Sequence, residues 1–334
     1  MQVRHLGKFG MTDFSFFKNK KIIVTGSSGL LGSWLVEDLV ENNAEVTGIS
    51  IDNSKDDLLK SKGLLQKIET HYLNVANYSQ LEKVFSSKNF DIIFHLAAQT
   101  QVTEALRNPV QTLESNIQGT WNVLELCRKF NFPIVSASSD KSYGISDNLP
   151  YIESHPLNGK FPYEVSKSSS DLISTMYKTT YGLSVVSLRC GNIFGGGDFN
   201  WDRLIPGTIK TFLENSTPVL RTKGDFVREW VYVKDVSSAY LEVAKAMLEE
   251  KNNFSAYNFS SGESKTVKEI YEVISHLING KIIEPIIDLD SEFEIKNQTL
   301  DSSLIKNDLG IYSKYEFDQS LEETIKWYKT HLGV

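Results

Sequence analysis

The chain has 334 residues, of which 40% are hydrophobic and 23% are charged, and its formal net charge is −7. A chain of this length and apolar content can bury a large core, which excludes disordered, collagen-like and disulfide-scaffold proteins. The acidic balance argues against nucleic acid as a partner, because phosphate binding needs clustered lysine and arginine.

The N-terminal segment Met1–Lys21 mixes charged and aromatic residues and lacks the apolar core of a signal peptide. No apolar run in the chain approaches the roughly 20 residues that span a bilayer, so no membrane partner is predicted. Both cysteines, Cys127 and Cys190, lie inside apolar stretches. Two buried thiols indicate a reducing compartment, and the sequence therefore predicts a cytoplasmic protein.

Short apolar runs alternate with helical patterns through the first half of the chain. The first run, Ile22–Val24, ends at a glycine-rich turn, and apolar residues then recur at helical spacing over Leu30–Val40. Apolar runs separated by helices indicate a parallel sheet covered on both faces. A doubly wound α/β domain is predicted over residues 1–189. Its further runs are Ala44–Ile51, Thr70–Val75, Asp91–Leu96, Phe132–Ala137 and Ser184–Leu188, and its further helices are Val102–Lys129 and Tyr163–Tyr181.

Beyond about residue 190 this rhythm loosens. Glycines cluster at Gly195–Gly197, and the segments that follow are shorter and mixed. A smaller mixed α/β lobe is predicted over residues 190–334, and such a lobe can exchange elements with the main sheet. Its helical patterns are Val236–Glu249, Val267–Leu277 and Leu321–Leu332.

A glycine-rich loop over Thr25–Gly32 joins the first strand to the first helix, with the spacing Gly-x-x-Gly-x-x-Gly. Glycines permit a tight turn and close approach of backbone to pyrophosphate, and a helix N-terminus supplies N–H groups and a favourable dipole. The loop predicts a dinucleotide site; an ordinary glycine-rich turn is the alternative. The expected contacts are Gly26, Ser28, Gly29, Leu30, Leu31 and Gly32.

Asp52 follows the second apolar run, about 20 residues beyond Gly32. A carboxylate at this place accepts the ribose hydroxyls and repels a 2′-phosphate, which favours NAD over NADP. Two alternatives stay open. Ser50 can occupy the ribose position instead, and Asp52 with Asn53 can simply start a turn.

Tyr163 and Lys167 lie at the start of the helix that follows Pro162. Residues four apart share one helix face, and a cation beside a phenol lowers its pKa from about 10 toward neutrality. Such a tyrosine can take the proton from a hydroxyl while the carbon gives a hydride to nicotinamide. A tyrosine and a lysine at this spacing are common in proteins. The pair indicates catalysis here because it follows a dinucleotide loop.

Ser139, Asp140 and Lys141 come just after the fifth strand-like run. The carboxyl ends of strands are where doubly wound sheets build their sites. Three adjacent groups of this kind can donate, accept and exchange protons. A polar turn is the alternative interpretation.

Together these motifs resemble the extended short-chain dehydrogenase/reductase family, and within it the nucleotide-sugar 4,6-dehydratases. Enzymes of the dTDP-glucose group carry Asp-Glu where this chain has Asp140 and Lys141, and simple epimerases usually lack an acid/base pair there. The segments that match the family are Thr25–Gly32, His95–Gln99, Asn116 with Gly119–Thr120, Ser139–Gly144, Tyr163–Lys167 and Arg189–Asn192. Those that resemble the CDP-glucose group are Gly32–Leu35, Ala44–Gly48, Ser139–Lys141, Gly195–Asp198 and Asp202–Pro206.

The resemblance implies a lyase that oxidises the sugar at C4 on a recycled NAD, eliminates water across C5 and C6, and returns the hydride to C6. Tyr163 is then the base for the C4 hydroxyl, and Ser139 bonds the C4 oxygen. Asp140 is the acid, and Lys141 replaces the usual glutamate as the C5 base. A lysine base must be neutral, which requires burial or neighbouring cations. Lys167 also contacts the cofactor.

A nucleotide-diphosphosugar brings a pyrophosphate into an acidic protein, so local donors are needed. Arg203 and Arg228 are the expected ones, because guanidinium groups bind phosphate bidentately. Asn192 is expected at the phosphate or ribose; either arginine can instead be a surface ion-pair partner. The family motif adds Ala97 at the cofactor and Gln99 at the substrate.

Two other functions remain open. A 4-epimerase uses the same Ser139, Tyr163, Lys167 and NAD, but has no use for Asp140 and Lys141. A non-catalytic family member binds NAD(H) as a sensor or scaffold. The resemblance also implies a homodimer, in which the two long helices of each chain form a four-helix bundle. No metal site is predicted.

Overall fold

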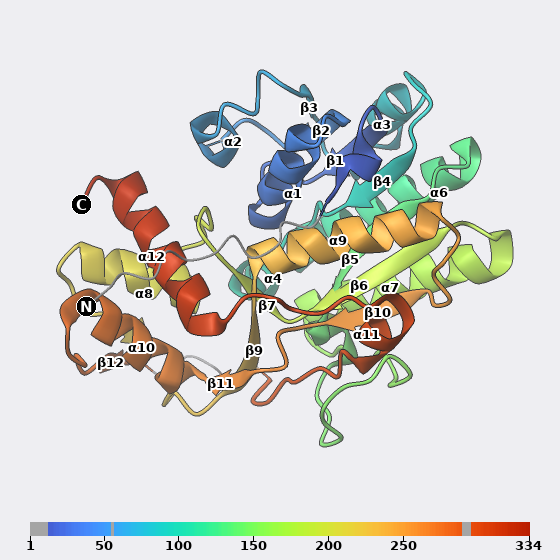
Figure 1. Cartoon of the computed structure of the whole chain (residues 1–334). Coiled ribbons are helices and arrows are strands. Elements are labelled where there is room, and N and C mark those ends of the chain that lie inside the picture. Colours follow the sequence, from blue (N-terminus) through green and yellow to red (C-terminus); the bar gives the residue numbers. More distant parts are fainter. Residues whose placement is uncertain (1–12, 55–56, 289–294) are drawn as a thin grey trace.

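The computed structural model describes residues 13–54, 57–288 and 295–334, so residues 1–12 of the N-terminal segment lie outside the described residues. A seven-stranded sheet with the order β3-β2-β1-β4-β5-β6-β10 forms its centre, and all neighbouring strands are parallel (Figure 1). The predicted doubly wound parallel sheet is confirmed. The strands are β1 (Lys21–Thr25), β2 (Glu45–Ser50), β3 (Glu69–Tyr72), β4 (Ile92–His95), β5 (Ile134–Ser139), β6 (Val185–Cys190) and β10 (Ala256–Phe259).

The strands contribute side chains to two apolar layers. Ile22 and Val24 belong to one layer and Ile23 to the other. Successive residues of a strand point to opposite faces, so a run that is apolar throughout fills both layers. Helices α1 (Leu30–Glu41), α9 (Val233–Leu248) and α11 (Ser303–Leu309) cover the first layer, and α3 (Tyr78–Phe85), α6 (Gly119–Phe130) and α7 (Pro162–Tyr181) cover the second.

The single helix predicted over Val102–Lys129 is wrong. Helix α4 (Val102–Arg107) is followed by Asn108, whose backbone leaves the helical conformation (φ −128°, ψ 67°). Proline disfavours the helical conformation in the residue before it, so Pro109 causes this break. The chain continues through α5 (Pro109–Leu113) and one π-helical turn, η2 (Glu114–Gln118), into α6. A short α2 (Asp57–Ser61) lies earlier in the chain.

The later part of the chain builds a smaller mixed lobe on the sheet β11-β9-β7 (Figure 1). Helix α9, strand β10 and helix α11, although later in the chain than residue 189, belong to the main sheet and its first apolar layer. The division at residue 189 stays a prediction. The lobe contains β7 (Asn192–Phe194), α8 (Leu204–Leu213), β8 (Val219–Leu220), β9 (Val227–Tyr232), β11 (Ser264–Thr266), α10 (Val267–Asn279), β12 (Ile286–Ile287) and α12 (Phe317–Leu332).

Candidate active site

The candidate site lies at the carboxyl edge of the main sheet. The glycine loop follows β1, Ala97 and Gln99 follow β4, and Ser139 ends β5. The strand order reverses between β1 and β4, because β2 lies on one side of β1 and β4 on the other. Ligands of doubly wound sheets bind at such a switch point.

The glycine loop has the geometry of a pyrophosphate site. Gly26 has φ +72°, and a Cβ there would lie 2.8 Å from the Ala97 nitrogen; one at Gly32 would lie 2.1 Å from the Gly26 oxygen. Both positions therefore require glycine. Among the described residues no side chain caps the N-terminus of α1 at Gly29, so the N–H groups of Leu30 and Leu31 remain for an anion. This loop, which includes Ser28, fits a dinucleotide.

Ser50 and Asp52 were the two candidates for contact with the ribose hydroxyls of the cofactor. The Ser50 hydroxyl is buried and bonds that of Ser27 at 3.0 Å. Asp52 lies exposed just beyond β2, and its carboxylate accepts the Ser54 N–H at 2.8 Å. The turn that was the alternative is thus present, and Asp52 as the ribose acceptor stays a prediction.

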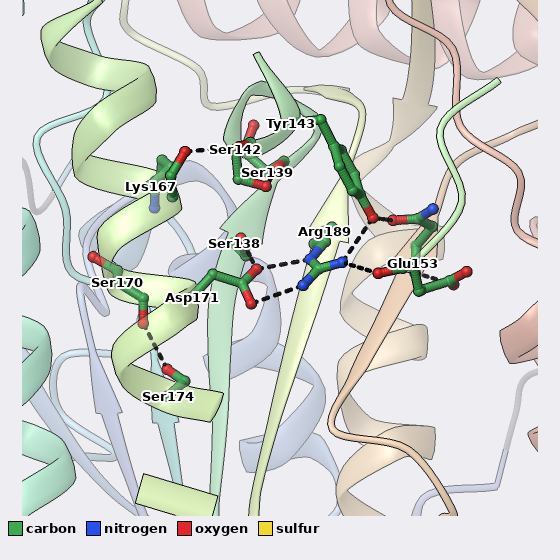
Figure 2. Close-up of polar contacts among 12 residues, drawn as sticks. Ser138, Ser139, Ser142, Tyr143, Glu153, Lys167, Ser170, Asp171, Ser174 and Arg189 are labelled. Atoms are coloured by element: carbon green, nitrogen blue, oxygen red, sulfur yellow. Dashed lines mark hydrogen bonds and ion pairs between the residues drawn. The ribbon is translucent and has the colours of Figure 1, made fainter. Parts of the chain in front are cut away.

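One face of α7 is bonded to three consecutive residues at the end of β5. Tyr163, Lys167 and Asp171 are four apart and therefore share this face. The Ser138 hydroxyl donates to Asp171 at 2.7 Å (Figure 2). The other two pairs are Lys167 Nζ with the Ala137 carbonyl (3.2 Å) and Tyr163 with the Ser139 side chain. The structure thus brings together the predicted Ser139, Tyr163 and Lys167.

Burial dominates the pKa values of the catalytic pair. It raises the pKa of Tyr163 to about 12, although Arg203 and Ser139 act to lower it. Burial also lowers the pKa of Lys167 to about 8, partly offset by Asp171. The predicted pKa of Tyr163 near neutrality is wrong for the protein alone, because burial outweighs the charge of Arg203.

Asp140 and Lys141 form an ion pair. The Asp140 carboxylate is buried; it accepts the Ser139 hydroxyl at 2.8 Å and the Lys141 ammonium at 3.1 Å. The ammonium also donates to the Asn192 side-chain oxygen at 3.0 Å. A neutral lysine was predicted to need burial or neighbouring cations; Lys141 is half-buried, and both of these partners are acceptors. Asn192, predicted at the phosphate or ribose, here bonds Lys141.

Arg203 lies at the catalytic centre. Its guanidinium donates to Asp198 at 2.9 Å and to the Thr100 hydroxyl at 3.1 Å, and its charge acts on Tyr163. The Gln99 amide, in contrast, donates to the Gln101 carbonyl in its own loop and to the Thr112 hydroxyl of α5. The substrate roles of both residues stay predictions.

Arg228 lies on β9 and is buried. Its guanidinium donates to the carbonyls of Val227 (2.9 Å) and Lys296 (2.8 Å). Arg228 is thus buried rather than at the surface, and its contact with a phosphate also stays a prediction.

Residues 22–258 match the model of the NAD dependent epimerase/dehydratase family. The chain belongs to this family. Its cofactor is accordingly NAD, for which the loop at Gly26–Gly32 supplies the uncapped helix terminus.

The relatives of this chain include dehydratases as well as epimerases. It is 28% identical to a CDP-glucose 4,6-dehydratase of Salmonella typhimurium, over 96% of this chain and 93% of the relative. It is 31% identical to a putative UDP-glucose 4-epimerase of Methanocaldococcus jannaschii, over 93% and 99%. A dTDP-glucose 4,6-dehydratase of Bacillus anthracis, solved with NAD, superposes with a TM-score of 0.81 at 27% identity, over 93% and 97%. This epimerase/dehydratase is therefore an enzyme of nucleotide-sugar chemistry.

A buried polar network beneath the site was missed in the sequence. Arg189 on β6 bonds Asp171 through two contacts, Nε–Oδ2 at 2.8 Å and Nη2–Oδ1 at 2.9 Å (Figure 2). It also donates to the Tyr143 hydroxyl at 2.8 Å and to the Glu153 carbonyl at 3.0 Å. Tyr143 in turn donates to Asn258 of β10 at 2.7 Å. The four-residue step from Lys167 to Asp171 was the one available signal.

The described residues contain neither a metal-holding group of side chains nor a membrane-spanning helix. In this part of the chain no group of three or more His, Cys, Asp or Glu side chains could hold a metal ion. Across the same residues, no helix is both long and apolar enough to cross a membrane.

Proposed function

We propose that the chain is an NAD-dependent nucleotide-diphosphosugar 4,6-dehydratase, with CDP-glucose as the first substrate to test. The observation that carries this proposal is the Asp140–Lys141 pair, bonded directly to Ser139. Oxidation at C4 needs only one base, which Tyr163 supplies. Loss of water across C5 and C6 needs a second base and an acid, and this pair supplies both.

The first step uses the bonded face of α7. NAD, when bound, accepts a hydride from the sugar and later returns it. Tyr163, as the phenolate, takes the proton of the C4 hydroxyl, and Ser139, in contact with Tyr163, holds the C4 oxygen. Lys167, whose ammonium lies against the Ala137 carbonyl, supplies positive charge beside the reacting oxygen.

The second step uses the ion pair. Moving one proton across the 3.1 Å contact converts it into a neutral amine and a carboxylic acid. Lys141 then accepts the C5 proton, and Asp140 gives its proton to the C6 hydroxyl, which leaves as water. When the hydride returns to C6, Lys141 gives its proton back to C5. The proton that Tyr163 took in the first step restores Asp140, so the balance is the loss of one water.

Substrate anchoring is proposed at two arginines. Arg203 lies next to Thr100 and acts on Tyr163, which suits a phosphate close to the reacting sugar. Arg228 shares its strand face with Trp230, whose buried indole N–H has no partner among the described residues. A buried donor without a partner favours an incoming acceptor such as a nucleotide oxygen.

The reaction is tested by incubating the holoenzyme with CDP-, dTDP-, GDP- and UDP-glucose, with mass detection of the product. Loss of one water supports the dehydratase. A product of unchanged mass but altered C4 configuration supports the 4-epimerase, which the M. jannaschii relative favours. No conversion of any of the four contradicts both and favours a non-catalytic NAD(H)-binding member.

Lys141→Met is expected to lower the dehydration rate by about 10²- to 10⁴-fold, the usual contribution of a general base. Oxidation at C4 should persist, because Tyr163 and Lys167 are untouched, so reduced nicotinamide accumulates and is read by its absorbance. Lys160→Met, at an exposed lysine near the start of α7, is the matched control. Full dehydration by Lys141→Met would show that another group is the base.

A homodimer is proposed because apolar side chains are exposed on helices that pack against one another. Leu172 and Met176 of α7 are 55% and 41% exposed, Trp121 of α6 is 43% exposed, and Val110 of α5 is 66% exposed. Helix α7 contacts both α5 and α6, and α6 and α7 cover the same face of the main sheet. Large apolar patches commonly mark interaction surfaces.

Leu172→Glu is expected to convert a dimer into a species at the chain mass of 37.7 kDa, measured by light scattering after size exclusion. A charge placed in an apolar interface is costly unless it is paired. Ile286→Glu, at a 53% exposed isoleucine in the smaller lobe, is the matched control and should leave the dimer intact. A parent protein that is monomeric at micromolar concentration contradicts the proposal.

A reducing compartment, the cytoplasm, is also proposed. Cys127 and Cys190 are both free and both buried. Burial raises the pKa of each thiol, so neither is poised to react. Unreactive buried thiols are typical of proteins that do not depend on disulfides.

A further inference from the structure

A buried chain of hydrogen bonds runs from the strand before the glycine loop to the helix that carries Tyr163. It crosses β1, β4, η2, α6 and α7, and its members are at least nine-tenths buried. In order, they are Thr25, His95, Thr120, Asn116 and Ser166.

The direction of the first bond follows from counting protons at Thr25. Its hydroxyl oxygen accepts the Ala97 N–H at 3.2 Å and shares the Leu96 N–H, also at 3.2 Å, with the main-chain carbonyl of Thr25 at 3.1 Å. Both of these partners are donors, so the hydroxyl directs its own proton to its remaining partner. The acceptor is His95 Nδ1 at 2.8 Å, which therefore carries no hydrogen.

The donor and acceptor of the next hydrogen bond follow from the protonation of the His95 imidazole. A neutral ring without a proton on Nδ1 carries it on Nε2, which then donates to the Thr120 hydroxyl at 3.1 Å. The Thr120 hydroxyl donates to the main-chain carbonyl of Asn116 at 2.6 Å. The ring stays neutral because burial, with a smaller effect of the Lys167 charge, lowers the pKa of His95 to about 3.

Asn116 joins this chain to the catalytic helix. Its amide nitrogen donates to the Ser166 hydroxyl at 2.9 Å, and Ser166 donates to the Tyr163 carbonyl at 2.7 Å. Its amide oxygen accepts the Gln99 N–H at 2.7 Å. The π-helical turn places this side chain between the loop after β4 and the first turn of α7.

We propose that His95, as the neutral Nε2–H tautomer, and Thr120 form a positioning device that sets the register between the NAD loop and the Tyr163/Lys167 pair. The loop begins at Gly26, directly after Thr25, whereas Tyr163 lies on a separate helix, so their relative placement depends on packing between elements. Hydride transfer requires reacting atoms about 3 to 3.5 Å apart, and a shift of about 1 Å can cost 10²-fold. The inference rests on the proposed function only in its C4 oxidation step.

The tautomer is tested directly by NMR of holoenzyme labelled with ¹⁵N-histidine, with His95→Phe assigning the signal among the six histidines. We expect a protonated Nε2 and an unprotonated Nδ1 that do not titrate between about pH 5 and pH 9, where a free imidazole would. A protonated Nδ1, or a titration in this range, overturns the proposal. This readout holds whatever reaction the enzyme catalyses.

Positioning is tested with Thr120→Val and Thr120→Ser. The valine variant lacks the hydroxyl and should lower kcat for C4 oxidation at least about 10-fold, with the KM of the nucleotide sugar within about twofold. The serine variant keeps the hydroxyl and should recover kcat to within about threefold. Thr324→Val in α12 is the matched control, because Thr324 is also buried and donates to the carbonyl four residues earlier, at 2.7 Å.

The outcomes separate the possibilities. Equal kcat in Thr120→Val and the parent overturns the positioning role, and so does an equal loss in Thr324→Val, which would indicate a general effect of deleting a buried hydroxyl. If no nucleotide sugar is converted, the proposed function fails by itself. The His95 signal in Thr120→Val then decides: a retained Nε2–H signal with unchanged NAD affinity overturns the device, and weakened NAD binding supports it.

Discussion

Replacing Tyr163 with phenylalanine is expected to lower kcat for C4 oxidation by about 10²- to 10⁴-fold. The substitution removes the group that takes the C4 proton and leaves the ring in its buried place beside Ser139. NAD affinity should change little, because the cofactor loop belongs to β1 and α1. Single-turnover absorbance of the reduced nicotinamide measures the step, and calorimetric titration measures the affinity.

Tyr181→Phe provides the control for this experiment. Tyr181 ends the same helix and is 54% exposed, so losing its hydroxyl should leave kcat unchanged. If Tyr163→Phe retains kcat within tenfold of the parent, a different group takes the C4 proton. The buried phenol would then be a packing residue.

Asp171→Ala is expected to lower the free energy of unfolding by about 3 to 5 kcal/mol, because it leaves the buried Arg189 guanidinium without its carboxylate. Urea denaturation followed by circular dichroism measures this change. Glu272→Ala, which breaks the exposed contact with Lys268, should cost less than about 1 kcal/mol. If Asp171→Ala lowers the free energy of unfolding by an equally small amount, the Asp171–Arg189 pair is not buried as described.

The double variant Asp171→Leu with Arg189→Met separates pairing from burial. An apolar pair of similar volume avoids burying charge, so part of the stability should return. Full recovery is not expected, since Tyr143 and the Glu153 carbonyl also lose the arginine as a donor. Removing Asp171 should also lower the pKa of Lys167 further below about 8, because the Asp171 charge raises it.

The sequence determined those features that depend on neighbours along the chain. Residues of alternating direction in a strand fill two layers, so apolar runs such as Ile22–Val24 predict a sheet covered on both faces. The glycine spacing predicts a turn that other residues cannot adopt, as the φ of +72° at Gly26 confirms. The four-residue step from Tyr163 to Lys167 predicts one shared helix face.

Only the tertiary structure decided how distant segments meet. Lys141 bonds Asn192 from 51 positions away, and Asp171 bonds Arg189 across α7 and β6. These contacts depend on which elements pack together, and no local periodicity encodes that. Burial of a side chain is likewise a property of the whole fold, so the pKa of Tyr163 rises to about 12 although its local sequence indicates the reverse.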